Sequence, residues 1–201
     1  MFFARPIFLM AILGFSIYSF LNRKTDGCHV KLPGHVPGKF YNATDLAFSK
    51  NQDTVYYDQQ HFSGYVFALY PNNDTAFVFG YLNGLLEGRI RRWYPNKQIA
   101  EDRFYIQGGK EGVHKGWWEN GKPKFEYHFA NNEFEGLATE WFNTGKLFRL
   151  LNYKQGHEAG SEKIWWDNGR IRANYVMVNG QKFGLSGQKL CINNVTKISV
   201  K

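Results

Sequence analysis

Glycine recurs at a fixed interval through the middle of the chain. Six glycines follow one another at steps of 24 residues: Gly64, Gly88, Gly112, Gly136, Gly160 and Gly184. Four tryptophans keep the same step, each followed by a second aromatic residue: Trp93-Tyr94, Trp117-Trp118, Trp141-Phe142 and Trp165-Trp166. A period of this length is typical of small units stacked in a row, each burying its apolar side against its neighbours. The chain is therefore expected to fold as a linear array.

Each repeat has the pattern of a β-hairpin. Phe125, Tyr127 and Phe129 alternate with polar residues, which is the period of a half-buried strand. Aromatic residues make up 18% of the chain and there are 21 glycines. This combination suits hairpins, because aromatic residues favour strands and glycine supplies positive-φ turns.

Two sets of turn residues separate the expected strands. The dipeptide Asn120-Gly121 predicts a tight two-residue turn in which both residues have positive φ. A second set follows the second strand of each repeat and is expected to form a longer turn: Asn83-Gly84, Gln107-Gly108, Asn131-Asn132, Gln155-Gly156 and Asn179-Gly180. The glycine at the start of each repeat, such as Gly136, is expected to leave room where an aromatic ring crosses the backbone.

Together these patterns predict an all-β fold. We expect an elongated, single-layer antiparallel meander of stacked β-hairpins with a 24-residue period, after an N-terminal hydrophobic helix. The expected segments are a signal peptide or membrane anchor (1–27), a spacer (28–39), an N-terminal capping repeat (40–63), five repeats (64–183) and a C-terminal capping repeat (184–201).

The N-terminal segment indicates export or anchoring. Residues 1–21 carry one charge, Arg5, and the apolar run is long for a signal peptide and short for a membrane span. Three outcomes stay open: an uncleaved anchor, a lipoprotein acylated at Cys28, or a soluble secreted protein. We expect a membrane-anchored or exported protein outside the cytoplasm, in a bacterial envelope.

The charge distribution argues against nucleic acid as a partner. The chain has a formal net charge of +8. Between Gly64 and Gly187, however, 16 Lys and Arg residues face 13 Asp and Glu residues, a net charge of +3. Acidic residues stand beside the basic ones throughout, so no stripe of positive charge follows the array.

Catalytic chemistry is not indicated by any motif. The carboxylates of Glu87, Glu111 and Glu135 fall at expected turns and are predicted to be solvated. His114 and His128 lie on the two strands of one hairpin and are expected to form an ordinary cross-strand pair. We therefore expect no catalytic residues, metal, cofactor or small-molecule substrate, and a protein that is not an enzyme.

The tryptophan positions are the candidates for partner binding. Adjacent aromatic residues point to opposite faces of a strand, so one member of each pair must lie away from the face of Phe125. We expect an exposed row formed by Trp93, Trp117, Trp141 and Trp165. An aromatic ladder that only stabilises a thin sheet is the alternative.

The pattern resembles MORN repeats. The segments that carry the likeness are Trp117-Trp118-Glu119-Asn120-Gly121-Lys122 and Trp165-Trp166-Asp167-Asn168-Gly169-Arg170, and the bacterial YwqK-like antitoxin variant is the most similar form. The resemblance covers Phe62 to about Gly187. It implies a scaffold that contacts another protein or membrane lipid, with an antitoxin-like role. A glycan-binding aromatic array of the cell wall is the alternative function.

Overall fold

The computed structural model describes residues 32–45 and 47–186, and within them every regular element is a β-strand. Sixteen of these strands form one sheet. Its continuous path runs β1 (Phe40–Asn42), β5 (Gly64–Leu69), β6 (Thr75–Leu82), β8 (Gly88–Trp93), β9 (Ile99–Ile106), β11 (Gly112–Trp117), β12 (Pro123–Ala130), β14 (Gly136–Trp141), β15 (Leu147–Lys154), β17 (Gly160–Trp165), β18 (Ile171–Val178) and β19 (Gln181–Leu185). Four two-residue strands pair beside this path: β7 (Leu85–Leu86), β10 (Gly109–Lys110), β13 (Glu133–Phe134) and β16 (His157–Glu158).

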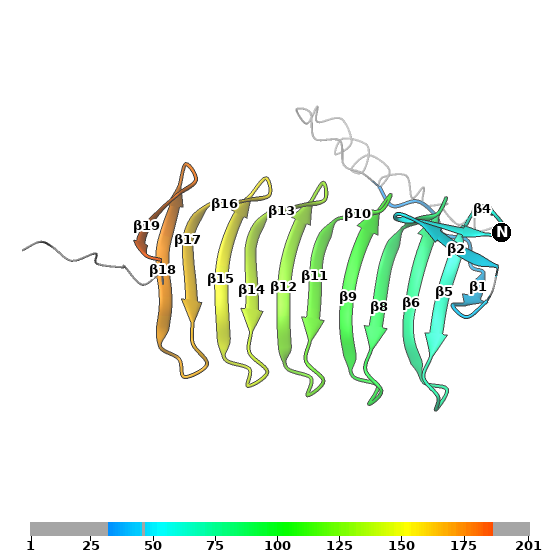
Figure 1. Cartoon of the computed structure of the whole chain (residues 1–201), viewed down its shortest axis with the longest axis horizontal. Coiled ribbons are helices and arrows are strands. Elements are labelled where there is room, and N and C mark those ends of the chain that lie inside the picture. Colours follow the sequence, from blue (N-terminus) through cyan, green and yellow to red (C-terminus); the bar gives the residue numbers. More distant parts are fainter. Residues whose placement is uncertain (1–31, 46, 187–201) are drawn as a thin grey trace, which may run out of the picture. The chain divides into compact units, whose positions relative to one another are not determined.

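The repeat unit is an antiparallel hairpin, as the sequence predicts. In the hairpin of β11 and β12, Gly112 lies opposite Phe129 and Gly116 lies opposite Phe125, with a shift of register between Gly116 and Trp117. Strand β12 then pairs with β14 of the next repeat, so that Phe125 lies opposite Glu140. Figure 1 shows these hairpins side by side along one long sheet. The prediction of stacked hairpins is confirmed.

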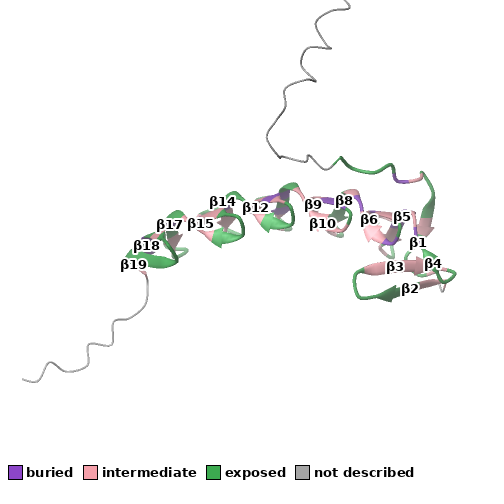
Figure 2. Ribbon diagram, turned by 90° about the horizontal axis from the view of Figure 1, so that it is seen from above, coloured by how far each residue is buried: buried purple, intermediate pink, exposed green. Residues whose placement is uncertain are grey.

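The N-terminal end of the sheet departs from a single-layer antiparallel meander. Strand β1 pairs with β5 in parallel. Residues from the expected capping repeat form a separate three-stranded sheet: β2 (Phe48–Asn51), β3 (Thr54–Tyr57) and β4 (Gln60–His61). This small sheet lies on one side of the main sheet near β5 and β6 (Figure 2). Backbone bonds join the two, because Val55 N donates to Gly84 O and Gly84 N donates to Phe62 O.

Aromatic rings hold the small sheet in place. Phe62, which is 4% exposed, has ring contacts with Tyr41, Phe48, Tyr57 and Tyr81 at centroid distances of 5.2, 5.1, 6.2 and 6.0 Å. Such pairs add about 0.5–1.5 kcal/mol each beyond area burial. These rings therefore pack the small sheet as a second layer against the face of the main sheet at this end.

The prediction for the two turn types was wrong, because the turns with two successive positive-φ residues are the other set. The turns at the bottom of Figure 1 have one positive-φ residue each, for example Gly121 at 79°, while Asn120 does not have positive φ. Here Gly121 N donates to Trp118 O and Trp118 N donates to Lys122 O. The turns at the top are the two-residue ones, since Val178 pairs with Gln181 and both intervening residues have positive φ.

Four of the six repeat glycines are needed for backbone conformation and not for space, whereas at Gly64 a Cβ atom would lie 3.0 Å from the Phe62 ring. Gly88, Gly112, Gly136 and Gly160 have φ between 67° and 79°. A Cβ atom built on any of these four would meet nothing within 4 Å. The expected ring across the backbone is therefore absent at these four positions. Each glycine instead lets the chain bend between a short strand and the next long one, in a conformation that L-residues adopt only at a cost.

The core is thin, and one buried column of it contains a histidine and a glutamate. The column that faces inward in successive repeats is Val66, Ile90, His114, Ala138 and Glu162, with exposures of 8%, 6%, 1%, 4% and 0%. His114 Nε2 donates to Phe104 O at 2.7 Å, and burial lowers the pKa of this histidine. Glu162 Oε1 accepts from Asn152 N at 3.0 Å, and burial raises the pKa of this carboxyl to about 7.

The expected N-terminal helix and Cys28 lie outside the described residues, as does the C-terminal cap beyond residue 186. Among residues 32–45 and 47–186, no helix is long and apolar enough to cross a membrane.

Candidate functional site

The upper edge of the array is tied together by carboxylates and backbone bonds. Glu87 Oε2 accepts from Gln107 N at 2.7 Å, and the same position in later repeats, Glu111 and Glu135, accepts from the next upper turn at 3.0 and 2.8 Å. Glu87 also accepts from Gly34 N at 2.7 Å and is 1% exposed. The expectation of solvated carboxylates is wrong for Glu87, because two backbone N–H groups replace water around it.

The second residue of each of the first four upper turns donates a further backbone bond to the segment before it. The donors and acceptors are Gly84 N to Phe62 O, Gly108 N to Leu86 O, Asn132 N to Lys110 O and Gly156 N to Phe134 O, at 2.7–3.0 Å. These turns therefore stack on one another.

The lower edge carries a second ladder, formed by the second aromatic residue of each pair. Tyr70 and Tyr94 donate their hydroxyls to the carbonyl oxygens of Trp93 and Trp117 at 2.7 and 3.0 Å. Trp118 Nε1 donates to Trp141 O at 3.1 Å. Phe142 holds the next position and has no donor. The residue type in this column (Tyr, Tyr, Trp, Phe, Trp) therefore decides whether a side chain can donate a hydrogen bond to the next repeat. Sequence reasoning missed this role.

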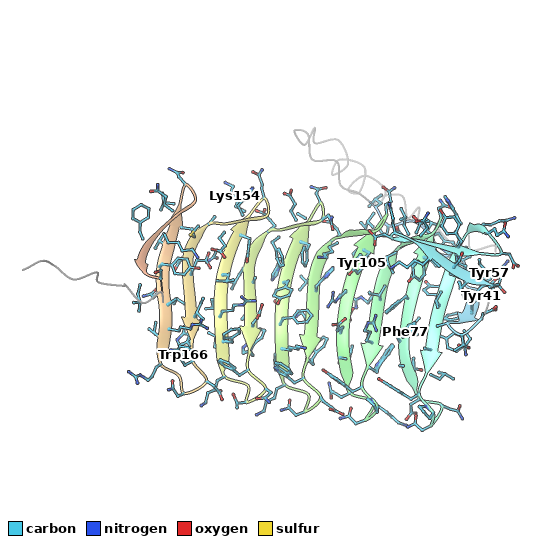
Figure 3. The ribbon with its side chains drawn as sticks, in the orientation of Figure 1. Tyr41, Tyr57, Phe77, Tyr105, Lys154 and Trp166 are labelled. Atoms are coloured by element: carbon cyan, nitrogen blue, oxygen red, sulfur yellow. The ribbon has the colours of Figure 1, made fainter. Side chains whose placement is uncertain are left out.

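The four predicted partner-binding tryptophans do not form an exposed row. Trp93, Trp117, Trp141 and Trp165 are all half-buried, and the first three accept the lower-edge bonds through their carbonyl oxygens. The exposed tryptophan is Trp166, with 51% exposure, at the last lower turn (Figure 3).

One face of the sheet carries a set of aromatic rings from the long strands that contact one another, and we call it the aromatic face. Strand pairing places Phe125, Tyr127 and Phe129 on it opposite Gly116, His114 and Gly112. The rings of Phe125 and Tyr127 stack at 4.6 Å with an interplanar angle of 13°. Because a Cβ on Gly116 would lie 2.2 Å from the Phe125 ring, only glycine lets this ring lie against the neighbouring strand.

Charged groups are interleaved with these rings in neutral pairs. Glu140 Oε1 accepts from Tyr127 OH and from Arg149 Nη2, both at 2.5 Å. Burial and the bond to Glu140 raise the pKa of the Tyr127 phenol, so it remains a donor at neutral pH. Arg92 lies 4.6 Å from the centroid of Phe79, a cation–π distance. The face is therefore aromatic with compensated charges.

His114 and His128 lie on opposite faces and do not pair, contrary to expectation. His114 lies opposite Tyr127 on the aromatic face, whereas His128 lies opposite Val113. On that second face, Lys115 forms an ion pair with Glu126 at 2.9 Å, and this contact lowers the pKa of the Glu126 carboxyl. His128 Nε2 is 3.4 Å from the same carboxylate.

Two adjacent segments of the array match a known family. Residues 110–131 and 134–155 each match the model of the MORN repeat variant. The matches support a MORN-repeat protein. Each matched MORN repeat begins at or within a short upper strand, β10 or β13, and ends in the next upper turn. No curated protein matches the chain.

Proposed function

We propose that this MORN array is a non-enzymatic scaffold that binds another protein through its aromatic face. MORN repeats are commonly scaffolds for protein or lipid interaction, and the fold fits that use. The observation that carries the proposal is the double ladder of hydrogen bonds along the upper and lower edges. These bonds hold the hairpins in register, so the aromatic side chains keep a fixed spacing before any partner arrives, which lowers the cost of binding.

The tryptophan column is not assigned to the main contact. Trp93, Trp117, Trp141 and Trp165 are half-buried. Trp93 lines a hollow with Val78, Arg89 and Arg91, whose side chains alternate along β6 and β8 with those of the aromatic face. We therefore assign the main contact to the aromatic rings of the long strands, such as Phe125 and Tyr127.

A crosslinking experiment in the native host tests the scaffold proposal. A photoreactive amino acid placed at Arg149, on the aromatic face, should give a discrete covalent adduct with one protein. The matched control is Leu150, the next residue of β15, which points to the other face. The proposal fails if both positions give the same adducts or if neither gives one.

We further propose that the N-terminal segment holds the array at the outer side of a bacterial membrane, and that the partner relation is antitoxin-like. The support is the apolar run of residues 1–21 and the resemblance of the repeats. Intact mass of the protein extracted from membranes separates the full chain, a cleaved chain and a chain acylated at Cys28. A cytosolic protein of full-chain mass would contradict anchoring, and a crosslinked partner without toxicity when expressed alone would contradict the antitoxin role.

A further inference from the structure

A hollow of about 310 Å³ lies on the aromatic face where the repeat of β11 and β12 meets the repeat of β14 and β15. Phe125 and Tyr127 line it together with Trp118, Phe142 and Phe148. The ring centroids of Phe142 and Phe148 are 4.8 Å apart. Ligand pockets usually occupy about 300–1,000 Å³, so this hollow has room for one ring-sized group and little more.

The charges around the hollow are unequal. Glu140, which lines it, is already neutralised by Arg149 and accepts a hydrogen bond from the Tyr127 hydroxyl. Lys124 also lines it, half-buried, with Nζ 4.5 Å from the centroid of the Trp118 ring. Among the described carboxylates, none forms an ion pair with Lys124. By contrast, Lys115, on the other strand of the same hairpin, forms an ion pair with Glu126. The hollow therefore carries one uncompensated positive charge.

The last repeat holds the same local contact away from this hollow. Arg172 lies 4.6 Å from the centroid of the Trp166 ring, as Lys124 does from Trp118. These positions are 48 residues apart and thus equivalent in the repeat. Arg172 does not line the hollow, which makes it a matched control for the chemistry of a cation over tryptophan.

We propose that this hollow binds an aromatic side chain that has a carboxylate beside it, in an acidic segment of the protein partner. The aromatic ring fills the space between Trp118 and Phe148, and the carboxylate pairs with Lys124. The inference rests on the proposed scaffold function, which it narrows to one anchor site. Buried aromatic anchors in pockets supply most of the affinity of many protein interfaces.

Two small probes test the site without knowledge of the partner. N-acetyl-phenylalanine carries the ring and the carboxylate, and N-acetyl-phenylalanine amide carries the ring alone. The full-length protein is titrated with each, and the indole N–H signal of Trp118 is followed by NMR, with Trp118→Phe identifying the signal. The acid should bind up to about fivefold more tightly than the amide, the range expected for a partly exposed ion pair.

Two variants locate the charge that causes this difference. Lys124→Met should reduce the affinity for the acid to that for the amide, while Arg172→Met should leave both unchanged. Equal binding of acid and amide to the unmodified protein, no binding of either, or an equal loss in both variants would overturn the proposal. Loss of binding to phosphatidylglycerol vesicles in Lys124→Met, without any response to the acid, would assign the site to lipid instead. If the anchor site fails this test, the crosslinking result for the scaffold function still stands. The two proposals can therefore be tested separately.

Discussion

The indole Nε1 of Trp118 donates a hydrogen bond to the carbonyl oxygen of Trp141, 3.1 Å away in the next repeat. The equivalent donor at the next step is missing, because Phe142 has no polar atom to offer the carbonyl of Trp165. The lower ladder therefore contains one gap, and this gap lies beside the proposed binding hollow.

Filling the gap should stabilise the protein. Phe142→Tyr supplies a hydroxyl like that of Tyr94, which reaches Trp117 O at 3.0 Å. We expect a gain of about 0.5–1.5 kcal/mol in the free energy of unfolding, the usual net value of one hydrogen bond. Trp118→Phe should lose a similar amount. Urea unfolding measures both, and a destabilised Phe142→Tyr variant would show that the ladder bond is not formed there.

Glu87 should matter more than the carboxylates that follow it. It is 1% exposed and accepts two backbone N–H groups, whereas Glu135 is exposed and accepts one. Glu87→Gln leaves a buried donor without a charged acceptor and should cost about 1.5–3 kcal/mol. Glu135→Gln is the control and should cost well under half of that. Similar losses in the two unfolding curves would mean that burial adds nothing to this bond.

The contribution of Glu162 to stability should fall as pH rises from about 4.5 to about 7. Its pKa is raised to about 7 by burial, so the folded protein holds a proton that the unfolded chain releases near 4.5. The contribution of this proton to the free energy of unfolding is complete below pH 4.5 and lost above pH 7. In total it amounts to about 3 kcal/mol. Glu162→Gln mimics the protonated form and should flatten this part of the profile.

His114 acts in the opposite direction as the pH falls below about 6.5. Burial lowers its pKa, so the unfolded chain takes up a proton near 6.5 before the folded protein does, and acid destabilises the fold. The pH series must therefore be run on Glu162→Gln and on the unmodified protein in parallel. A difference between the two curves that does not grow between pH 4.5 and 7 would contradict the assignment to Glu162.

Gly136→Val should cost more stability than Gly145→Ala. Both positions have positive φ, 79° and 88°, but a β-branched residue tolerates this region least. We expect about 2 kcal/mol for the first change and about 1 kcal/mol for the second, measured by thermal unfolding. Gly136→Asn is the control, since asparagine accepts positive φ at Asn131 and Asn132. If Asn costs as much as Val, crowding and not φ limits this position.

The repeat period predicts the hairpins because each copy repeats one local pattern of strand and turn. Residues such as Phe125, Tyr127 and Phe129 alternate so clearly that strand and face follow from order alone. The sequence predicts the two-residue turn at 120–121 and the longer turn at 155–156, and the structure has the opposite. The two could not be told apart because Asn-Gly and Gln-Gly are similar in composition. The difference lies in how many residues have positive φ, which depends on the register of the flanking strands.

The contacts between repeats were not predictable in the same way. Glu87 looks like any carboxylate at a turn, and its burial comes from Gly34, 53 residues earlier. His114 and Glu162 occupy the same column as Val66 and Ile90, and their burial follows from that column being the inward one. Phe125, which lines the hollow, lies against the neighbouring strand because Gly116 has no side chain. None of these follows from local pattern alone.

The upper turns give the array a direction. In the first four of them the backbone N–H groups donate to the segment that precedes the hairpin, as Gly108 does to Leu86 and Asn132 does to Lys110. Each hairpin thus completes the upper-edge bonds of its own turn as soon as its predecessor is folded, without waiting for residues further along. A chain that emerges N-terminus first, from a ribosome or a translocation channel, can add one 24-residue unit at a time to a finished template. The covered N-terminal end, where the small sheet packs on Phe62 and Tyr81, is the natural starting point for this growth.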